Sequence, residues 1–200
     1  MKRSRVVKTA ESPEAWPGVS DREILLKIAR NSILSLFSID TEEGETDYTG
    51  FLSDKLGAFV SLHNKNGALR GCLGQITSET PLYRLVKQLA KSAASKDYRF
   101  SPVKQEELDE IIIEISVLSP LKRLYSLCEI EKGIHGIYIK NGKQSGTFLP
   151  QVILETNWDV ETFVSKCSKD KAGLGPDGWK DAEMYVYTAE VFREGEWVNK

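Results

Sequence analysis

The chain has 200 residues, of which 40% are hydrophobic and 28% are charged, and its formal net charge is −2. This balance is typical of a globular protein with a sizeable core. It argues against a strongly basic nucleic-acid-binding protein, and no apolar run approaches the length of a membrane span. We therefore expect neither nucleic acid nor a membrane as a partner.

The N-terminal basic cluster lacks the apolar run of a signal peptide, so we expect residues 1–18 to be a flexible tail and 19–200 to be a single domain. The three cysteines lie far apart and are odd in number. This argues against a disulfide framework and a zinc ribbon, and indicates a cytoplasmic protein. With only two histidines we expect no metal site. The sequence does not identify a cofactor.

Helical and strand patterns alternate along the chain. Ser20 and Glu23 form a capping-box pattern at the start of an apolar helical repeat over 19–38, and an acidic connection follows over 40–50. Alternating residues over 57–76, interrupted by Asn66-Gly67, predict a β-hairpin. A helix is then expected over 80–95, with Thr80 as its N-cap and Pro81 as its first residue.

The second half of the chain again has a hairpin followed by a helix. A largely buried strand is predicted over 108–120, then a hairpin over 135–151 that turns at Asn141-Gly142, and then a helix over 159–169. The alternation over 182–194 predicts one long final strand. "KNG" occurs in both hairpins, which is consistent with an old duplication. The fold class we predict is α+β: a mostly antiparallel sheet with two strand-turn-strand-helix units and flanking helices, plus a smaller lobe.

A free cysteine, Cys72, lies in the second strand of the first hairpin. A two-residue turn at Asn66-Gly67 places Leu62 opposite Gly71 and Val60 opposite Leu73, so that apolar residues coincide on one face. Strict alternation would put Leu69 on that same face. It would put Arg70, Cys72 and Gly74 on the other face, with Ser61 opposite Cys72 and His63 opposite Arg70. Cys72 is thus expected beside an arginine, where a thiolate is favoured, although a lone cysteine in a strand commonly serves packing.

Six motifs, spaced in order along the chain, resemble the AMMECR domain family. They are "LRGCLG" (69–74), "KDYRFSPV" (96–103), "IEISVLSP" (113–120), "GIHGIYI" (133–139), "LPQV" (149–152) with Trp158, and "KAGL" (171–174) with Trp179. The resemblance runs from about Gly57 to Phe192. It implies one compact α+β unit with a smaller lobe and a cleft near "LRGCLG". It also implies, for microbial members, association with a Memo-type dioxygenase-like protein and a radical-SAM protein. It implies no reaction. Ile153-Leu154 departs from the small residues usual there, and His63 matches no family motif.

Three residues are catalytic candidates. Cys72 is the candidate nucleophile, and His135, between Ile134 and Gly136, is a candidate for proton transfer or a hydrogen-bonded structural group. Glu114 lies in an apolar strand and needs a partner, for which Arg70 or Arg99 is the natural expectation. A paired Glu114 would be structural, whereas a raised pKa would make it an acid or base.

Five residues are candidates for binding a substrate. Arg70 would bind an anion or, alternatively, a structural carboxylate or backbone carbonyl. Gly71 and Gly74 would admit a ligand or close strand packing. Arg99 would recognise a ligand with Asp97 or would fix the loop after the helix. Gln151 follows a proline at a helix start, where free N–H groups receive anions or where it serves simple capping.

The other two cysteines, Cys128 and Cys167, lie in apolar-flanked segments and are expected to pack in the interior. Three classes of function remain. The first is a cysteine-dependent enzyme acting on a small anionic substrate, with Cys72 as nucleophile and His135 or His63 as base. The second is a non-catalytic module that binds a small molecule or nucleotide. The third is a protein-interaction scaffold.

Overall fold

The chain divides into two compact units in the computed structural model, which describes residues 16–40 and 46–195. Within the described residues, the large unit comprises 17–118 and 189–195, and the small unit comprises 119–188 with Trp16. The tail expected over 1–18 lies outside the described residues, apart from its last three positions. Each unit has its own sheet and its own core.

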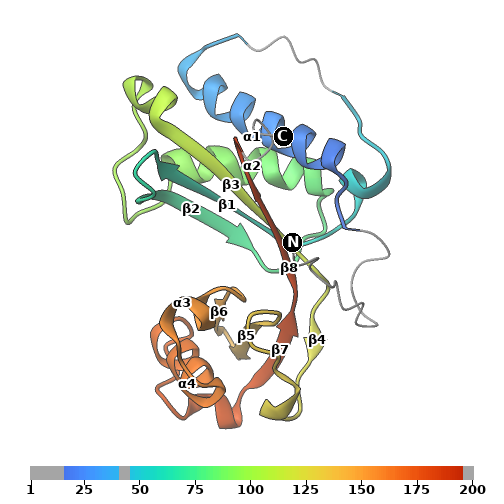
Figure 1. Ribbon diagram of the computed structural model, residues 1–200, viewed down its shortest axis with the longest axis vertical. Coiled ribbons are helices and arrows are strands. Elements are labelled where there is room, and N and C mark those ends of the chain that lie inside the picture. Colours follow the sequence, from blue (N-terminus) through green and yellow to red (C-terminus); the bar gives the residue numbers. More distant parts are fainter. Residues whose placement is uncertain (1–15, 41–45, 196–200) are drawn as a thin grey trace, which may run out of the picture. The chain divides into compact units, whose positions relative to one another are not determined.

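The large unit is a four-stranded antiparallel sheet with two helices on one face (Figure 1). The strand order is β2-β1-β3-β8. Its elements are α1 (Val19–Leu34), η1 (Ser35–Phe37), η2 (Gly50–Ser53), β1 (Ala58–Asn64), β2 (Leu69–Gln75), α2 (Leu82–Ser95), η3 (Gln105–Glu110), β3 (Ile111–Leu118) and β8 (Ala189–Arg193). Val60, Leu62, Ile113, Ile115 and Phe192 point toward the helices and are completely buried.

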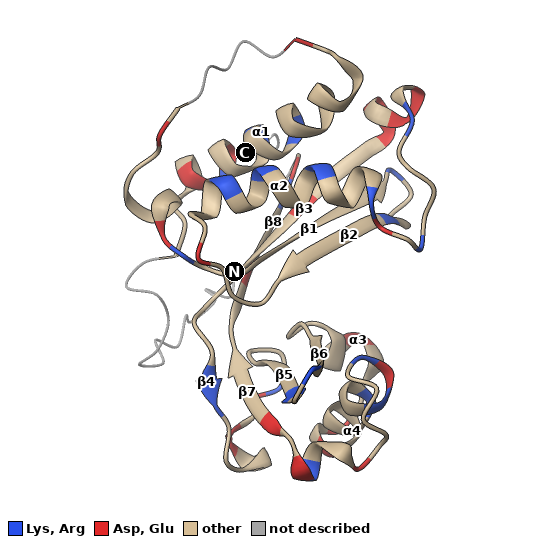
Figure 2. Cartoon of the chain, turned by 180° about the vertical axis from the view of Figure 1, so that it is seen from behind, with Lys and Arg blue, Asp and Glu red and all other residues tan. Residues whose placement is uncertain are grey.

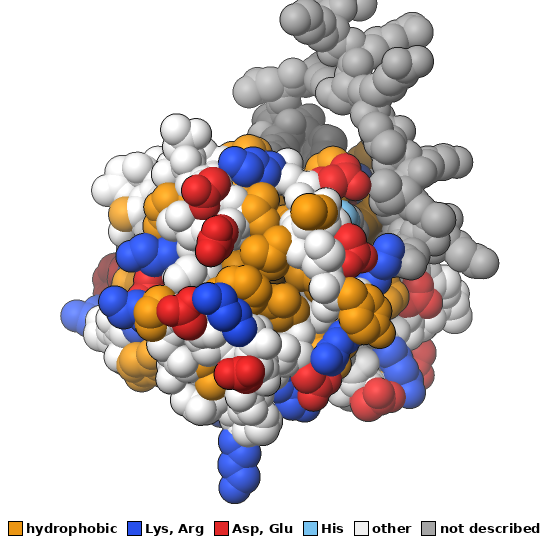
Figure 3. All heavy atoms as spheres, turned by 90° about the horizontal axis from the view of Figure 1, so that it is seen from below, with side chains coloured by type: hydrophobic (Ala, Val, Ile, Leu, Met, Phe, Trp, Pro, Cys, Tyr) orange, Lys and Arg blue, Asp and Glu red, His pale blue; other side chains and the backbone are white. Residues whose placement is uncertain are grey.

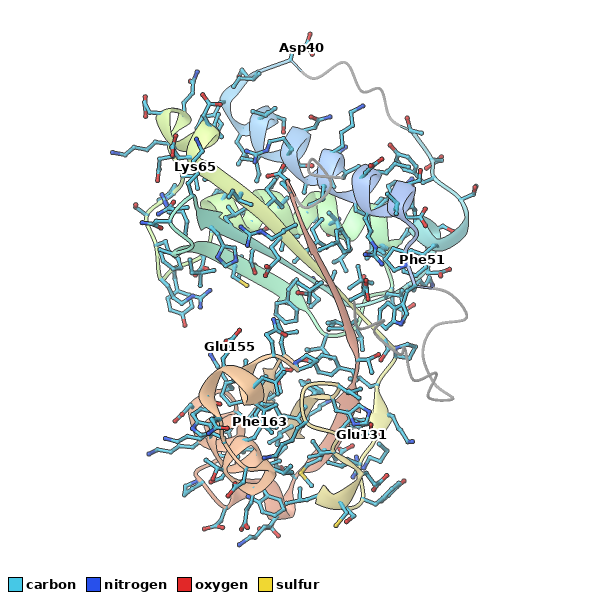
Figure 4. The ribbon with its side chains drawn as sticks, viewed as in Figure 1. Asp40, Phe51, Lys65, Glu131, Glu155 and Phe163 are labelled. Carbon is cyan, nitrogen blue, oxygen red and sulfur yellow. The ribbon has the colours of Figure 1, made fainter. Side chains whose placement is uncertain are left out.

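The small unit has a second antiparallel sheet, with strand order β4-β7-β5-β6. Its elements are β4 (Lys122–Arg123), η4 (Leu127–Glu129), β5 (Gly136–Asn141), β6 (Gln144–Phe148), α3 (Val152–Thr156), α4 (Val160–Asp170), η5 (Gly178–Asp181) and β7 (Glu183–Tyr187). Phe163 of α4 (labelled in Figure 4) is completely buried in the core of this unit. It stacks on Phe148 with ring centroids 5.6 Å apart. Helices and antiparallel sheets together confirm the predicted α+β class.

Local signals place most helices within a residue or two of their ends. The predicted N-caps are wrong, however. Helix α1 is capped at Gly18, whose N–H donates to the Asp21 carboxylate at 3.0 Å, and α2 begins at Leu82 with Pro81 in the N-cap position. The Gly18 N–H binds Asp21 three residues into the helix, and Pro81 immediately precedes the first helical residue, so both caps lie one or two residues from the predicted positions.

The final strand is not continuous, which corrects the expected single strand over 182–194. The alternating pattern runs unbroken through Thr188, but its main chain bonds to Ser119 instead of a strand. Ser119 N–H donates to the Thr188 carbonyl, and Thr188 N–H donates to the Ser119 hydroxyl, both at 2.9 Å. Strand β7 therefore pairs in the small unit and β8 pairs with β3 in the large unit.

Charged and apolar side chains are distributed unevenly over the surface. Figure 2 shows basic and acidic residues along α1 and α2. Figure 3 shows one face on which apolar side chains gather at the centre of a ring of charged ones. Among the described residues, no helix is both long enough and apolar enough to cross a membrane.

Candidate functional site

The β1–β2 hairpin carries Cys72 and has the predicted register over most of its length. Val60 pairs with Leu73, and Ser61 pairs with Cys72, as expected. The register then shifts, because a bulge at Arg70 makes His63 pair with Leu69. The predicted pairing of His63 with Arg70 is therefore wrong.

The bulge also changes which side chains share a face. Since Leu69 now pairs with His63, it lies on the opposite face from Gly71 and Leu73, and it is exposed. The prediction that Arg70 and Cys72 share one face of the sheet assumed strict alternation. The extra residue of the bulge interrupts the two-residue period, so alternation no longer supports that prediction. The local strand pattern contains no signal for this interruption.

The Cys72 thiol accepts a hydrogen bond from the Ser61 hydroxyl across the hairpin. The distance from Ser61 Oγ to Cys72 Sγ is 3.2 Å. The N–H of Cys72 points to the free edge of the sheet, so this is a non-hydrogen-bonded pair, in which facing side chains are closest. Both side chains lie on the sheet face opposite the helices, because their neighbours Val60, Leu62 and Gly71 face the helices.

The three cysteines differ in exposure. Cys72 is partly exposed, Cys128 is exposed, and Cys167 is buried. Burial raises the pKa of the Cys167 thiol to about 12. The interior position predicted for Cys167 is confirmed, whereas the interior position predicted for Cys128 is wrong. Cys128 lies in η4, a short turn whose first N–H groups face the Ser126 hydroxyl and solvent.

A loop after α2 holds the main chain of Cys72 at the edge of the sheet. The Asp97 carboxylate accepts the Cys72 N–H at 2.8 Å, and Arg99 Nη2 donates to the Cys72 carbonyl at 3.1 Å. Arg99 also donates to both oxygens of Asp97, at 2.9 Å from Nε and 2.7 Å from Nη2. We call Asp97, Arg99 and the Cys72 main chain the edge clasp. It occupies edge groups that would otherwise attract another strand.

The edge clasp fixes the charge of Asp97. Its side chain is 2% exposed and ion-paired with Arg99. The Arg99 hydrogen bonds, with a further contribution from the Cys72 N–H, lower the pKa of Asp97 to about 2. Asp97 in turn raises the pKa of Arg99, to which the nearby Cys72 and Tyr98 also contribute. The loop-fixing alternative therefore accounts for the contacts of Arg99, and its role in binding a substrate stays a prediction.

Arg70 is buried and bonded on several sides. Its Nε and Nη2 donate to the two oxygens of Glu107 at 2.7 and 3.0 Å, while Nη1 and Nη2 donate to the Ser101 and Pro102 carbonyls. The pair lowers the pKa of Glu107. Four of the five guanidinium N–H groups are thus engaged. This favours the structural alternative for Arg70, and anion binding by Arg70 stays a prediction.

Glu114 lies on the same sheet face as Cys72. It is the cross-strand neighbour of Ser61 on one side and of Arg193 on the other. Its nearest ionic partner is His63, with Nε2 3.7 Å from Glu114 Oε1. The expected pairing with Arg70 or Arg99 is wrong, because Glu107 and Asp97 take those two guanidinium groups. Cys72, Ser61, Glu114 and Arg193 form one polar row across the sheet, which we call the open-face row.

The two glycines beside Cys72 are explained by packing. A Cβ at Gly71 would lie 2.4 Å from the Ala93 carbonyl oxygen of α2, and a Cβ at Gly74 would lie 2.1 Å from the Phe59 ring. Neither position tolerates a side chain without movement. The packing alternative therefore accounts for both glycines, and contact of either with a substrate stays a prediction.

His135 and Gln151 belong to the small unit. His135 is partly exposed just before β5, and its Nδ1 accepts the Glu131 N–H at 3.1 Å. In a neutral imidazole this leaves the proton on Nε2. Gln151 precedes α3, a helix of five residues, and its carbonyl accepts the N–H groups of Leu154 and Glu155. The roles of both residues stay predictions.

Three contacts of the β1–β2 hairpin add to the sequence-based candidates. Ser61 was placed opposite Cys72 by the register, and this signal could have identified it as the partner of the thiol. The bond from the Cys72 N–H to Asp97 and the pairing of Arg70 with Glu107 join residues 25 and 37 positions apart, which no local pattern reveals. Among the described residues, no group of three or more His, Cys, Asp or Glu side chains could hold a metal ion.

Comparisons with known proteins agree on one family. The AMMECR1 family model matches residues 26–192. Protein MK0488 of Methanopyrus kandleri is 39% identical over 188 residues, covering 89% of this chain and 90% of its own. Protein PYRAB00100 of Pyrococcus abyssi is 40% identical, covering 86% and 89%. The crystal structure of the uncharacterized protein PH0010 from Pyrococcus horikoshii is similar with a TM-score of 0.78 and 36% identity, covering 86% of this chain and 91% of its own.

Proposed function

The chain belongs to the AMMECR1 family, and from its own residues we propose that it is a cysteine-dependent enzyme acting on a small anionic substrate at Cys72. In this proposal the sulfur of Cys72 forms a bond to an electrophilic centre of the substrate. The thiol proton passes to a base of the large unit, and the leaving group departs from the substrate.

The observation that carries the proposal is the hydrogen bond from Ser61 to a partly exposed thiol. A hydroxyl donor directed at sulfur stabilises the thiolate, which is the nucleophilic form. A cysteine used only for packing would be expected among apolar neighbours, as Cys167 is.

Arg99 is the cation in this proposal. Its guanidinium binds the Cys72 carbonyl, and its side chain is 42% exposed. The Arg70 side chain is buried, and its Nε and Nη2 both donate to Glu107. A guanidinium held beside a thiol favours both the thiolate and an approaching anion.

The base is supplied by the pair of His63 and Glu114. Glu114 follows Ser61 in the open-face row, and His63 lies on the same face two residues from Ser61. A carboxylate beside an imidazole orients the ring for proton transfer. Within the described residues, His63 Nε2 is a buried atom without a hydrogen-bond partner, so it can accept a proton when the site is occupied.

A non-catalytic binding module is the second candidate. It is favoured by the fact that the hydrogen-bond partner of the thiol is a hydroxyl, and no acid or base contacts Sγ among the described residues. In that case Cys72 would line a binding surface without forming a covalent bond.

Alkylation of each cysteine, read by mass spectrometry, separates the two candidates. Neutral iodoacetamide and anionic iodoacetate are compared at pH 6.5, with exposed Cys128 and buried Cys167 as references in the same molecule. An enzyme with an activated thiol should show Cys72 reacting about tenfold faster than Cys128, despite its lower exposure.

Two variants test which arginine attracts an anion to Cys72. R99Q should remove the preference of Cys72 for iodoacetate over iodoacetamide, whereas R70K should leave that preference unchanged in the folded protein. If Cys72 reacts no faster than Cys128 with either reagent, the enzyme proposal is wrong and the binding module stands.

A further inference from the structure

We propose that Tyr98 and Arg99 together select the substrate, and that this substrate carries a flat aromatic ring next to its anionic group. The inference rests on the proposed function, because it describes the ligand of the same site. It adds a residue, Tyr98, that the catalytic argument does not use.

Tyr98 is an exposed aromatic residue on a fixed loop. Its relative exposure is 94%, the highest among the large hydrophobic residues that the structure describes as exposed. It occupies the second position of a turn closed by the bond from the Phe100 N–H to the Asp97 carbonyl, at 3.0 Å. Asp97, the first residue of that turn, is held by Arg99 and by the Cys72 main chain.

A ring in this position is available for stacking at little entropic cost. The backbone that carries it is already ordered by the edge clasp, so binding would immobilise only the two side-chain torsions of the tyrosine. The Tyr98 hydroxyl makes no hydrogen bond to any described residue, so neither the ring nor its hydroxyl is tied to the protein, unlike the buried Tyr187.

Arg99 supplies the anion-binding half of the pair. Its Nε and Nη2 are engaged by Asp97 and Cys72, which fixes the plane of the guanidinium. Its Nη1 has no acceptor among the described residues. The guanidinium carbon lies 5.5 Å from the centroid of the Phe100 ring, a further constraint on its position. Two directed N–H groups thus remain for an oxyanion.

The two groups are consecutive residues of the turn that bonds to the Cys72 main chain. Arg99 Nη2 is 3.1 Å from the Cys72 carbonyl, and Tyr98 precedes Arg99 in the turn closed by the Phe100 N–H. In this proposal a ligand whose oxyanion binds Nη1 places its ring on the same turn, where the Tyr98 ring is exposed. An oxyanion without a ring would use Arg99 alone.

The experiment measures binding in the C72S variant, so that it does not depend on thiol chemistry. Amide chemical shifts of the 97–100 loop are followed during titration with phenyl phosphate and with inorganic phosphate. We expect phenyl phosphate to bind between about threefold and tenfold more tightly, because an aromatic contact adds to the shared oxyanion contact.

Four variants test the assignment. Y98A should bring the two affinities together, and Y98F, which keeps the ring, should preserve the difference. R99Q should weaken both ligands. Y125A removes another strongly exposed tyrosine, at 84% exposure in the small unit, and should change neither affinity.

Equal affinities for the two phosphates in the parent variant, or a preference that survives Y98A, would overturn the inference. The outcome is separable from that of the alkylation test. A reactive Cys72 without a ring preference would leave the enzyme proposal and remove this inference. A ring preference with an unreactive Cys72 would support ligand selection by a binding module.

Discussion

In both hairpins of the molecule, a glycine of the second strand packs closely against the backbone near the end of a later helix. The residues around the two glycines differ. In the large unit Gly71 pairs with the buried Leu62, and a Cβ there would lie 2.4 Å from the Ala93 carbonyl oxygen. In the small unit Gly146 pairs with the buried Ile139, and a Cβ there would lie 2.3 Å from the Ala172 nitrogen. In both units the second strand presses its backbone against the end of a later helix.

The residues that follow these glycines differ in their surroundings. Thr147 follows Gly146, and its hydroxyl is satisfied inside the small unit by the Ile137 carbonyl and the Tyr187 hydroxyl, both at 2.7 Å. Cys72 follows Gly71, and its thiol has one donor and partial exposure. Strand β2 is a free edge, which the edge clasp closes at Cys72.

Within "LRGCLG", the packing role of Gly71 is thus distinct from the chemical surroundings of Cys72. The glycine next to the thiol has a counterpart in the hairpin without a thiol, so its presence is no sign of a ligand. What is particular to the first hairpin is the combination of Cys72, Ser61 and the edge clasp.

The largest expected effect follows from adding a methyl group at either glycine. G71A should destabilise the large unit, and G146A the small unit, by about 3 kcal/mol, because the added Cβ meets backbone that cannot move independently. Hydrogen exchange should report the change in β1 and β3 for the first variant, and in β5 and β7 for the second.

G74A is the matched control for these glycines. Its Cβ would meet only the Phe59 side chain, which is partly exposed and can turn, so the loss should be smaller. If G71A costs no more than G74A, close approach to the helix does not explain the glycine beside Cys72, and a ligand role for Gly71 would have to be considered again.

A smaller effect is expected at the edge clasp, and it depends on pH. The pKa of Asp97 is about 2 in the folded chain, and that of an unfolded aspartate is about 3.9. Because the folded value is lower, the stabilisation is complete above about pH 4 and is lost as the pH falls toward 2. At neutral pH it amounts to about 2 kcal/mol, since Arg99 is partly exposed to solvent.

D97N should therefore lower the free energy of unfolding of the large unit at pH 7 and flatten its dependence on pH between 4 and 2. Urea unfolding followed by hydrogen exchange in β1 and β2 measures both quantities. D159N is the comparison in the small unit, where an exposed carboxylate accepts the Thr162 N–H at the start of α4. An acid dependence that is the same in D97N as in the parent chain would contradict the ionised clasp.

Local sequence signals predicted the elements because the helices and hairpins carry their own periodicities and turns. The pairing of Ser61 with Cys72 followed from the same signals, since two alternating strands and a turn fix a register. These inferences need only residues that are neighbours in the sequence or in one hairpin.

The wrong predictions about the hairpin register, the final strand and the partner of Glu114 depended on distant partners. The bulge at Arg70 accompanies its bonds to Glu107 and to the Ser101 and Pro102 carbonyls, and the break at Thr188 accompanies its bonds to Ser119. The partner of Glu114 was misassigned because both expected arginines bind nearer carboxylates. A charge pattern shows which groups need partners, but only the tertiary structure decides among them.

The smallest expected effect concerns the thiol itself. In S61A the Ser61 donor is removed from Cys72 Sγ, while the register and the edge clasp are retained. Alkylation of Cys72 by iodoacetamide at pH 6.5 should slow by about threefold to tenfold, because one hydrogen bond to the thiolate is lost. The free energy of unfolding should change by less than about 1 kcal/mol, since the sulfur is partly exposed.

The equivalent change in the second hairpin, T147A, should cost stability in the small unit without altering the labelling of Cys72. Cys128 provides the reference rate within each sample. An unchanged or faster rate at Cys72 in S61A would mean that the hydroxyl serves packing in the first hairpin as Thr147 does in the second, and the distinction between the two hairpins would then rest on the edge clasp alone.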